Sequence, residues 1–368
     1  MNPRRTIAAY LGLAVLCIAA ARPIEAQLVR MRRESGMEAY SGGSSRAGAA
    51  LVRSLGGLRG IVADLAWMRA LGMQEAGRHY ETVVLLDGLL EMQPHFTSVW
   101  AFQASVLAFD LGSVEANADA DAAYGWVRRG IGVLERGIER NPASAMLEER
   151  LAMLYLVKLS PASSDPSWKT LAGKLNDDLA GRSRLQGREQ TELVERIREH
   201  LADLAAQEGR PVPAPDDYTA LRLARWHFLR AASKRDITPG RKLLCERLAV
   251  RCLERMGDWA AAERSWLALY QGQGRKDPQG FFREFMVTVV CEQLLMGHGR
   301  ESREAFARMR RYFPDGPGSY REFLAGEIRG DRARGREDRA RLLYRALCAV
   351  EPGETRSYEE IAGGAAPR

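Results

Sequence analysis

The stretch Thr82–Leu107, TVVLLDGLLEMQPHFTSVWAFQASVL, holds the end of one helical pattern, a proline and the start of the next. A proline stops a helix because it has no amide hydrogen and its ring clashes with the preceding turn. After Pro94 come residues that match the first helix of a tetratricopeptide repeat: Trp100, Gln103, Ala104 and Leu107. Before it come two that match a second helix: Thr82 and Leu86. The stretch therefore predicts consecutive helical hairpins.

The same register returns along the chain. Two further second-helix patterns keep the proline at the same offset: Gly130, Leu134 and Pro142, and Ala340, Tyr344 and Pro352. Another first helix is indicated by Leu151, Ala152 and Tyr155. Two more hairpins are predicted in 248–270, with Gly257 at the turn, and in 296–315. No run of strand alternation appears. We therefore predict an all-α fold, an α-solenoid of five or six tetratricopeptide-like hairpins.

Breaks in the helical pattern define the expected domains. Gly, Ser and Ala are frequent in 34–55, which is typical of a flexible tether. The proline-rich segment 208–217, EGRPVPAPDD, is predicted to be a linker between two repeat blocks. We expect these blocks at 56–207 and 218–354, and a disordered tail at 355–368.

The N-terminus resembles a membrane-targeting segment. Arg4 and Arg5 precede an uncharged run, 6–21, and Arg22 follows it. A short apolar run with a basic flank is typical of a signal peptide or a signal anchor. The run is shorter than the roughly 20 residues that usually span a bilayer, although a flanking arginine side chain can extend it. Cleavage is disfavoured by Ile24, which is bulky where a small residue is wanted, so we favour a retained anchor over a cleaved signal.

The orientation of this anchor and its flank, 1–33, follows from the basic residues. They are nearly balanced on the two sides of the apolar run, but a short N-terminal tail with a basic pair usually stays in the cytoplasm. We therefore expect an anchor in the bacterial inner membrane and a body outside the cytoplasm. A cytoplasm-facing body is the alternative.

The charge does not indicate nucleic-acid binding. The 368 residues carry a net charge of +7, from 54 Lys and Arg against 47 Asp and Glu. Almost all of the cations are arginine, and Ala and Gly are abundant, a pattern typical of a genome-level composition bias. We expect no nucleic-acid partner.

The first repeat opens with GLRGIVADLAWMRA, 57–70, which places Asp64, Trp67 and Arg69 within an apolar helix pattern. The stripe that we expect to be buried consists of Ile61, Leu65, Met68 and Leu71 or Gly72, with Asp64 at its margin. Two interpretations remain. The charged pair bridges to a neighbouring helix and starts the solenoid, which we favour, or it lines a ligand groove.

The segment 56–104 closely resembles an uncharacterised bacterial family of membrane-anchored tetratricopeptide-like proteins that share a G-x-R-G-x-x-A-D-x-x-W-x-R-A opening. The likeness continues through 126–142 and fades after 159. Ala66 stands where a larger apolar residue is common in the family. The resemblance implies one N-terminal membrane helix and a helical-repeat body, and it brings no established activity.

Signatures of catalysis are missing from the sequence. The histidines are scattered and lack metal-ligand spacing: His79, His95, His200, His227 and His298. No phosphate-binding loop or nucleophile motif is found. We therefore expect no enzyme, no metal and no cofactor. The cysteines also lack ligand spacing, and a disulfide stays open if the body is exported: Cys245, Cys252, Cys291 and Cys348.

Two functions follow as hypotheses. The first is a non-catalytic, membrane-tethered scaffold of the bacterial envelope that binds a peptide or protein in the groove of the solenoid. Its candidate contact residues are Asp64, Trp67, Arg69, Trp100 and Tyr155. The second is an enzyme or small-molecule-binding protein in which four side chains converge in one pocket: Asp64, Arg69, His79 and Asp87.

Overall fold

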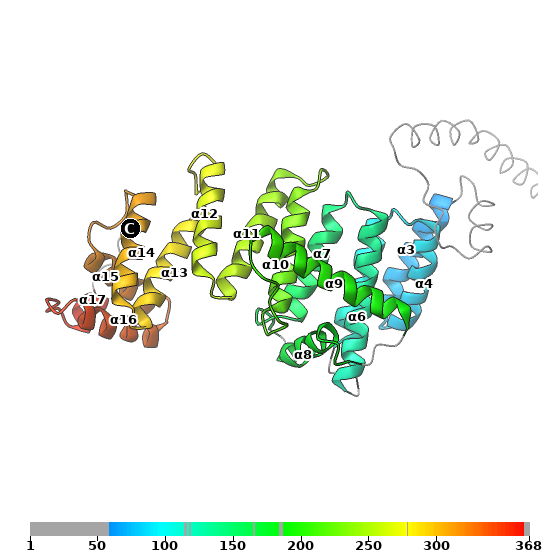
Figure 1. Ribbon diagram of the computed structural model, residues 1–368, viewed down its shortest axis with the longest axis horizontal. Helices are drawn as coiled ribbons and strands as arrows, with labels where there is room; N and C mark the ends of the chain where they lie inside the picture. Colours follow the sequence, from blue (N-terminus) through cyan, green and yellow to red (C-terminus); the bar gives the residue numbers. More distant parts are fainter. Residues whose placement is uncertain are drawn as a thin grey trace, which may run out of the picture. The chain divides into compact units, whose positions relative to one another are not determined.

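The structure is a computed structural model that describes residues 59–113, 116–117, 119–164, 166–183, 187–277 and 279–363. Throughout these residues the regular structure is helical, without strands (Figure 1). The all-α prediction is therefore confirmed for the described chain. The predicted anchor, 1–33, and tether, 34–55, lie outside the described residues. None of the described helices is both long and apolar enough to cross a bilayer.

Contacts divide the chain into two compact units, Met1–Met256 and Gly257–Arg368. The described helices of the first unit are α3 (Arg59–Glu75), α4 (His79–Met92), α5 (Thr97–Ser105), the π-helical η2 (Val106–Leu111), α6 (Ala120–Arg140), α7 (Ala145–Lys158), α8 (Trp168–Leu179), α9 (Arg188–Gln207), α10 (Thr219–Ser233) and α11 (Pro239–Arg255). Neighbours pack in pairs: α3 on α4, α5 on α6, α7 on α10 and α10 on α11.

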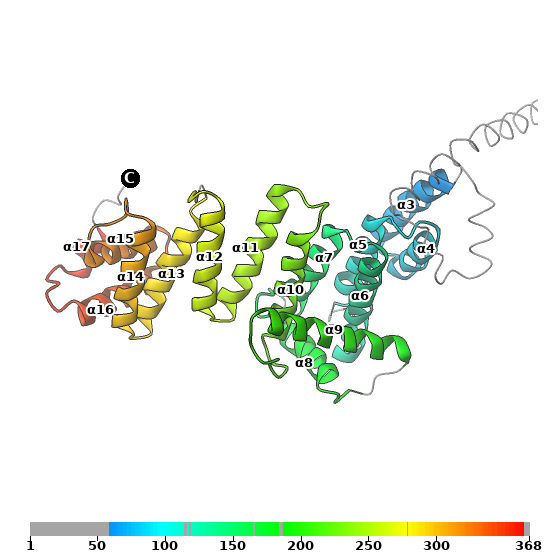
Figure 2. The same cartoon turned by 45° about the horizontal axis from the view of Figure 1, so that its top comes forward.

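Helices α8 and α9 interrupt this pairing. They lie between α7 and α10 in sequence, yet α7 and α10 pack directly on each other. The inserted pair lies against the outside of the repeats, with α8 on α6 and α9 on α10 (Figure 2). One apolar face of α9 is buried there, through Leu193, Ile197, Leu201 and Leu204. The first unit is thus a helical-repeat body with a two-helix insertion.

The second unit continues the pairwise packing of helices. Its described helices are α12 (Trp259–Gly272), α13 (Phe281–Leu295), α14 (Gly299–Tyr312), α15 (Tyr320–Ala333), α16 (Glu337–Val350) and α17 (Tyr358–Ala362). Helix α13 packs on α14, α15 on α16, and α17 on α15. The short α17 lies within the segment predicted to be a disordered tail, 355–368, and corrects that prediction for Tyr358–Ala362. It is started by a capping box between Ser357 and Glu360, and it is held by the buried Ile361.

The unit boundary also differs from the prediction. The proline-rich segment 208–217 lies inside the first unit, because α9 and α10 on either side of it pack together. The division falls instead between Met256 and Gly257, at the turn that joins α11 to α12. Proline content shows where a helix stops, but contacts decide where a unit ends.

Prolines end the helices where the sequence pattern places them. Four helices stop two residues before a proline: α4 before Pro94, α6 before Pro142, α14 before Pro314 and α16 before Pro352. The residue between the end of the helix and the proline has nearly the same backbone conformation each time. Its angles are φ −133° and ψ 73° at Gln93, and φ −117° and ψ 77° at Glu351. The ring of the following proline excludes the helical conformation there. The repeated proline is therefore a repeated stop signal.

Glycines make the turns inside the hairpins. Gly77, with φ 72°, joins α3 to α4, and Gly297, with φ 82°, joins α13 to α14. At each turn the next amide donates back to a carbonyl of the ended helix, from Arg78 to Met73 and from His298 to Gln293, both at 2.9 Å. This closing pattern needs a left-handed residue, which glycine adopts without steric cost.

The opening helix α3 buries a different face from the one predicted. Ile61, Leu65 and Met68 are 58%, 57% and 59% exposed, whereas Ala63 and Ala70 are buried. Helix α3 packs chiefly on α4, so only a narrow face is covered, and small residues let the two backbones come close. The predicted buried stripe is therefore wrong.

The described cysteines are free thiols: Cys245, Cys252, Cys291 and Cys348. Burial raises the pKa of the Cys245 thiol to about 11 and that of Cys252 to about 12. These two residues fill space in the helix packing of the first unit. Cys17 lies outside the described residues.

A close helix crossing of the first unit is at Gly130. A Cβ atom there would lie 3.0 Å from the Ala104 carbonyl oxygen and 3.2 Å from the Ala108 Cβ. About two turns further along α6, a Cβ at Gly137 would lie 3.0 Å from the Trp100 ring. Helix α6 can approach α5 and η2 this closely only because both positions lack a side chain.

We expect Gly130→Val to lower the free energy of unfolding of the first unit by about 1–3 kcal/mol, because the added methyl groups force the two helices apart. Gly125→Val is the matched control on the same helix, since a Cβ at Gly125 has no neighbour within 4 Å. Urea unfolding followed by tryptophan fluorescence measures both. Equal stability of the two variants would contradict the close crossing.

Candidate functional site

A groove of about 450 Å³ runs between α3, α5 and α7. It is called the α3–α5–α7 groove below. Its lining is mainly aromatic and aliphatic, and the side chains that shape it are Trp67, Phe102, Phe109, Met146, Met153 and Val157. Phe109 and Val157 are exposed, and Phe102, Met146 and Met153 are half-buried. Methionine and aromatic side chains give a surface that adapts to an apolar ligand.

One cationic side chain, that of Arg150, lines this groove. Arg150 on α7 is exposed and lines the groove. Within the part of the chain that the structure describes, Arg150 makes no ion pair and no side-chain hydrogen bond. An arginine head group in this position can bind a carboxylate with two parallel hydrogen bonds. The groove therefore combines an apolar floor with one cationic anchor.

Trp67 is the predicted contact residue that lies in this groove. Its ring packs 5.1 Å from that of Phe102 and 5.8 Å from that of Phe96. Trp100 and Tyr155 are instead core residues. The Trp100 indole donates to the Pro94 carbonyl at 2.9 Å, and Tyr155 is fully buried. Neither can reach a partner, because large residues beside a close helix crossing fill the interior.

The pocket predicted by the second functional hypothesis does not form. Asp64 and Arg69 are exposed on α3. His79 lies 3.6 Å from the carboxylate of Asp110. Asp87 accepts a 2.5 Å hydrogen bond from Gln103.

Among the described residues, no hydrogen bond or ion pair joins any two of these four predicted side chains. His79 and Asp87 are instead engaged by Asp110 and Gln103. The proposed convergence of Asp64, Arg69, His79 and Asp87 is therefore wrong.

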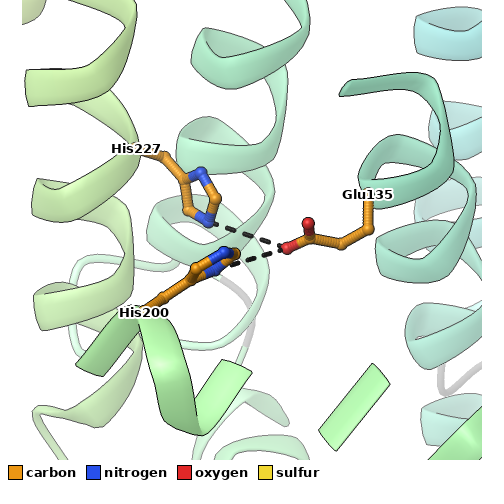
Figure 3. A group of neighbouring side chains, drawn as sticks. All are labelled: Glu135, His200 and His227. Carbon is orange, nitrogen blue, oxygen red and sulfur yellow. Dashed lines mark ion pairs between the residues drawn. The ribbon is translucent and has the colours of Figure 1, made fainter. Parts of the chain in front are cut away.

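The structure assembles a different polar group, which the sequence analysis missed. Glu135 from α6, His200 from α9 and His227 from α10 point toward one another (Figure 3). The Glu135 Oε1 atom lies 3.6 Å from His200 Nδ1 and 3.9 Å from His227 Nε2. The three residues are only 2%, 8% and 1% exposed. Two imidazoles and a carboxylate are thus gathered in the interior of the first unit.

A second buried carboxylate orients His227. Glu148 on α7 is fully buried, and its Oε2 atom accepts a 2.8 Å hydrogen bond from His227 Nδ1. Its Oε1 atom pairs with Arg230 at 2.9 Å and with Lys234 at 3.0 Å. The other ring nitrogen of His227, Nε2, faces Glu135.

The pKa values of Glu148 and Glu135 are shifted in opposite directions, because the two carboxyl groups have different partners. Burial opposes the ionisation of Glu148, but the hydrogen bond from His227 and the charge of Arg230 outweigh it and lower the pKa of Glu148 to about 2. Burial raises the pKa of Glu135, which has weaker partners. Glu148 is therefore an anion paired closely with Arg230 and Lys234, whereas the ion pair of Glu135 with Arg196 is longer, at 3.9 Å.

Several atoms of this group have no hydrogen-bond partner. They are Glu135 Oε1, His200 Nδ1, His227 Nε2 and the Tyr155 hydroxyl. The Tyr155 ring stacks on His227, with ring centroids 5.8 Å apart and an angle of 13°. Burial lowers the pKa of His200 to about 3, so its ring is neutral and offers a lone pair. The ligand atoms of Glu135, His200 and His227 lie within 4.8 Å of one another, a spacing that suits one metal ion.

No spacing motif could have found this group, because its members come from three helices far apart in sequence. The only signal was position. His200 interrupts the apolar face of α9 between Ile197 and Leu201, and Glu135 follows Leu134 within the buried face of α6. A histidine or glutamate on a core-facing stripe needs a buried partner.

Comparison of the sequence with models of protein families and with curated proteins gives no match. The function is therefore argued from the geometry of this chain.

We expect Glu148→Gln to lower the free energy of unfolding of the first unit by about 3 kcal/mol, because it leaves Arg230 and Lys234 without their buried anion. Urea unfolding at neutral pH measures the change. Glu192→Gln is the control, since Glu192 pairs with Arg188 on the surface and should cost less than about 0.5 kcal/mol. Similar losses in both variants would show that Glu148 is not an anchor.

Proposed function

We propose that this protein is a non-catalytic, membrane-tethered scaffold with tetratricopeptide-like hairpins, and that the α3–α5–α7 groove binds a segment of a partner protein. The observation that carries the proposal is the apolar groove with Arg150 beside it. In this assignment α3, α5 and α7 are the first helices of successive hairpins. Repeat proteins use such continuous surfaces to bind extended or helical segments.

The lining specifies the chemistry of the partner segment. Its bulky apolar side chains would fill the space between Trp67, Phe102 and Met153. One acidic residue, or a C-terminal carboxylate, would pair with Arg150. The groove is too apolar for a partner recognised by charge alone, so burial supplies the affinity and the arginine sets the register.

The segment 1–33 supports the membrane part of the proposal through its sequence. It combines a basic pair, an apolar run and a poor cleavage position. We propose that it is retained in the bacterial inner membrane and that 34–55 tethers the repeats outside the cytoplasm. A body in the cytoplasm would have the same groove and would differ only in topology.

Site-specific photocrosslinking in cells tests the groove. A photoreactive phenylalanine at Phe109, which is 36% exposed in the groove, is compared with one at Tyr218, which is 39% exposed outside it. We expect one protein to be captured at Phe109 and not at Tyr218. The captured partner is then purified, and its affinity for the full-length protein is measured directly.

Substitutions decide whether the groove makes the contact. We expect Val157→Arg and Arg150→Glu each to weaken binding five- to thirtyfold, equivalent to about 1–2 kcal/mol. Val212→Arg is the control, because Val212 is 55% exposed and lies outside the groove. Equal capture at both positions, or unchanged affinity in both groove variants, would overturn the proposal.

The anchor is tested separately. Deletion of 1–33 is expected to move the protein from the membrane fraction to the soluble fraction, because it removes the apolar run. A C-terminal alkaline phosphatase fusion, active only after export, reports the side of the membrane. A deletion variant that still sediments with membranes would show that the anchor lies elsewhere in the chain.

A further inference from the structure

We propose that Glu135, His200 and His227 bind one divalent transition-metal ion, with zinc as the ion that best fits two imidazoles and a carboxylate. This site is independent of the α3–α5–α7 groove, because its ligands come from α6, α9 and α10. Neutral imidazole nitrogens and a glutamate oxygen are ligand types of zinc. The site holds the donors already directed at one point (Figure 3).

The distances agree with nearly preformed coordination. Donors around a tetrahedral ion with bonds of about 2.0–2.1 Å lie roughly 3.3–3.4 Å apart. Glu135 Oε1 is 3.6 Å from His200 Nδ1 and 3.9 Å from His227 Nε2. Shifts of a few tenths of an ångström bring Glu135 Oε1 to this spacing from each histidine nitrogen, and the two histidine nitrogens lie within 4.8 Å of each other.

The partnerless donors are the second argument. A buried polar atom without a hydrogen bond loses its hydration and gains nothing in return, which destabilises the fold. Glu135 Oε1, His200 Nδ1 and His227 Nε2 are all in this state, and all three face the same point. A carboxylate oxygen and two imidazole nitrogens that offer lone pairs are satisfied together by a cation between them. One metal ion satisfies all three together.

The surroundings of His227 match those of a metal ligand. Histidine ligands commonly donate their second nitrogen to a carboxylate, which holds the ring in place and makes it more basic. Glu148 accepts this hydrogen bond from His227 Nδ1 at 2.8 Å. Glu148 also neutralises the closest cations on α10, Arg230 and Lys234. The other cation, Arg196, is 3.9 Å from Glu135 Oε2 and is shared with Glu139.

The position of the site suggests its role. It joins the inserted α9 to the repeat helices α6 and α10. A metal ion there fastens the insertion to the body, and its binding energy adds to the stability of the fold. Glu135 also borders a polar cavity of about 570 Å³, which gives the ion a way in from solvent. Three protein ligands leave a fourth position for water.

The test uses the full-length protein in detergent, stripped with a chelator and titrated with Zn²⁺ against a chromophoric competitor. We expect one equivalent of zinc to bind and to raise the midpoint of thermal unfolding. Cobalt is the second probe, because tetrahedral Co²⁺ has an intense visible absorption. Its spectrum reports the coordination geometry directly and does not depend on stability.

Two variants locate the ion. Glu135→Gln keeps the shape of the side chain and removes its charge, while His200→Phe keeps the ring that packs 6.0 Å from Trp226. We expect each to weaken zinc binding at least tenfold and to abolish the thermal shift. His298→Phe is the control, because His298 is exposed in the second unit.

Each outcome bears on the proposal. Zinc binding that is lost in both ligand variants and kept in the control supports it. Absence of a stoichiometric step in the wild-type protein would overturn the metal site. Binding of equal strength in all variants would place the zinc elsewhere and would overturn it as well.

Discussion

The close approach of α6 to α5 and η2 is the constraint on which the first unit depends. Gly130 and Gly137 on α6 leave room for Ala104, Ala108 and the Trp100 ring. The crossing orients α5, whose other face forms the floor of the α3–α5–α7 groove. The same helix carries Glu135 between the two glycines and presents it to the opposite side. One packing requirement therefore positions both candidate sites.

The inserted helices α8 and α9 make the two faces of the first unit different. They cover the side on which α6 and α10 lie, and their burial brings His200 against Glu135 and His227. The side formed by α3, α5 and α7 is left open. A scaffold needs an accessible groove and a rigid body behind it. Here the body is stiffened by a buried network of carboxylates, imidazoles and cations.

Local signals in the sequence predicted the elements well. Pro94, Pro142 and Pro352 each follow the end of a helix by two residues, and Gly257 lies at a helix turn. Trp67, a candidate contact residue, lines the α3–α5–α7 groove. The burial of α3 was predicted wrongly, because an apolar stripe at Ile61, Leu65 and Met68 says nothing about which neighbour covers it.

By itself, the sequence determined where helices begin and end, that they form hairpins, and that small residues sit at their crossings. These are short-range properties, set by backbone sterics and by the 3.6-residue period. Only the tertiary structure decided that α7 and α10 pair across an insertion, that Tyr155 is internal, and that Glu135 meets His200 and His227. Such contacts join residues far apart in the chain, and they depend on how whole helix faces bury one another.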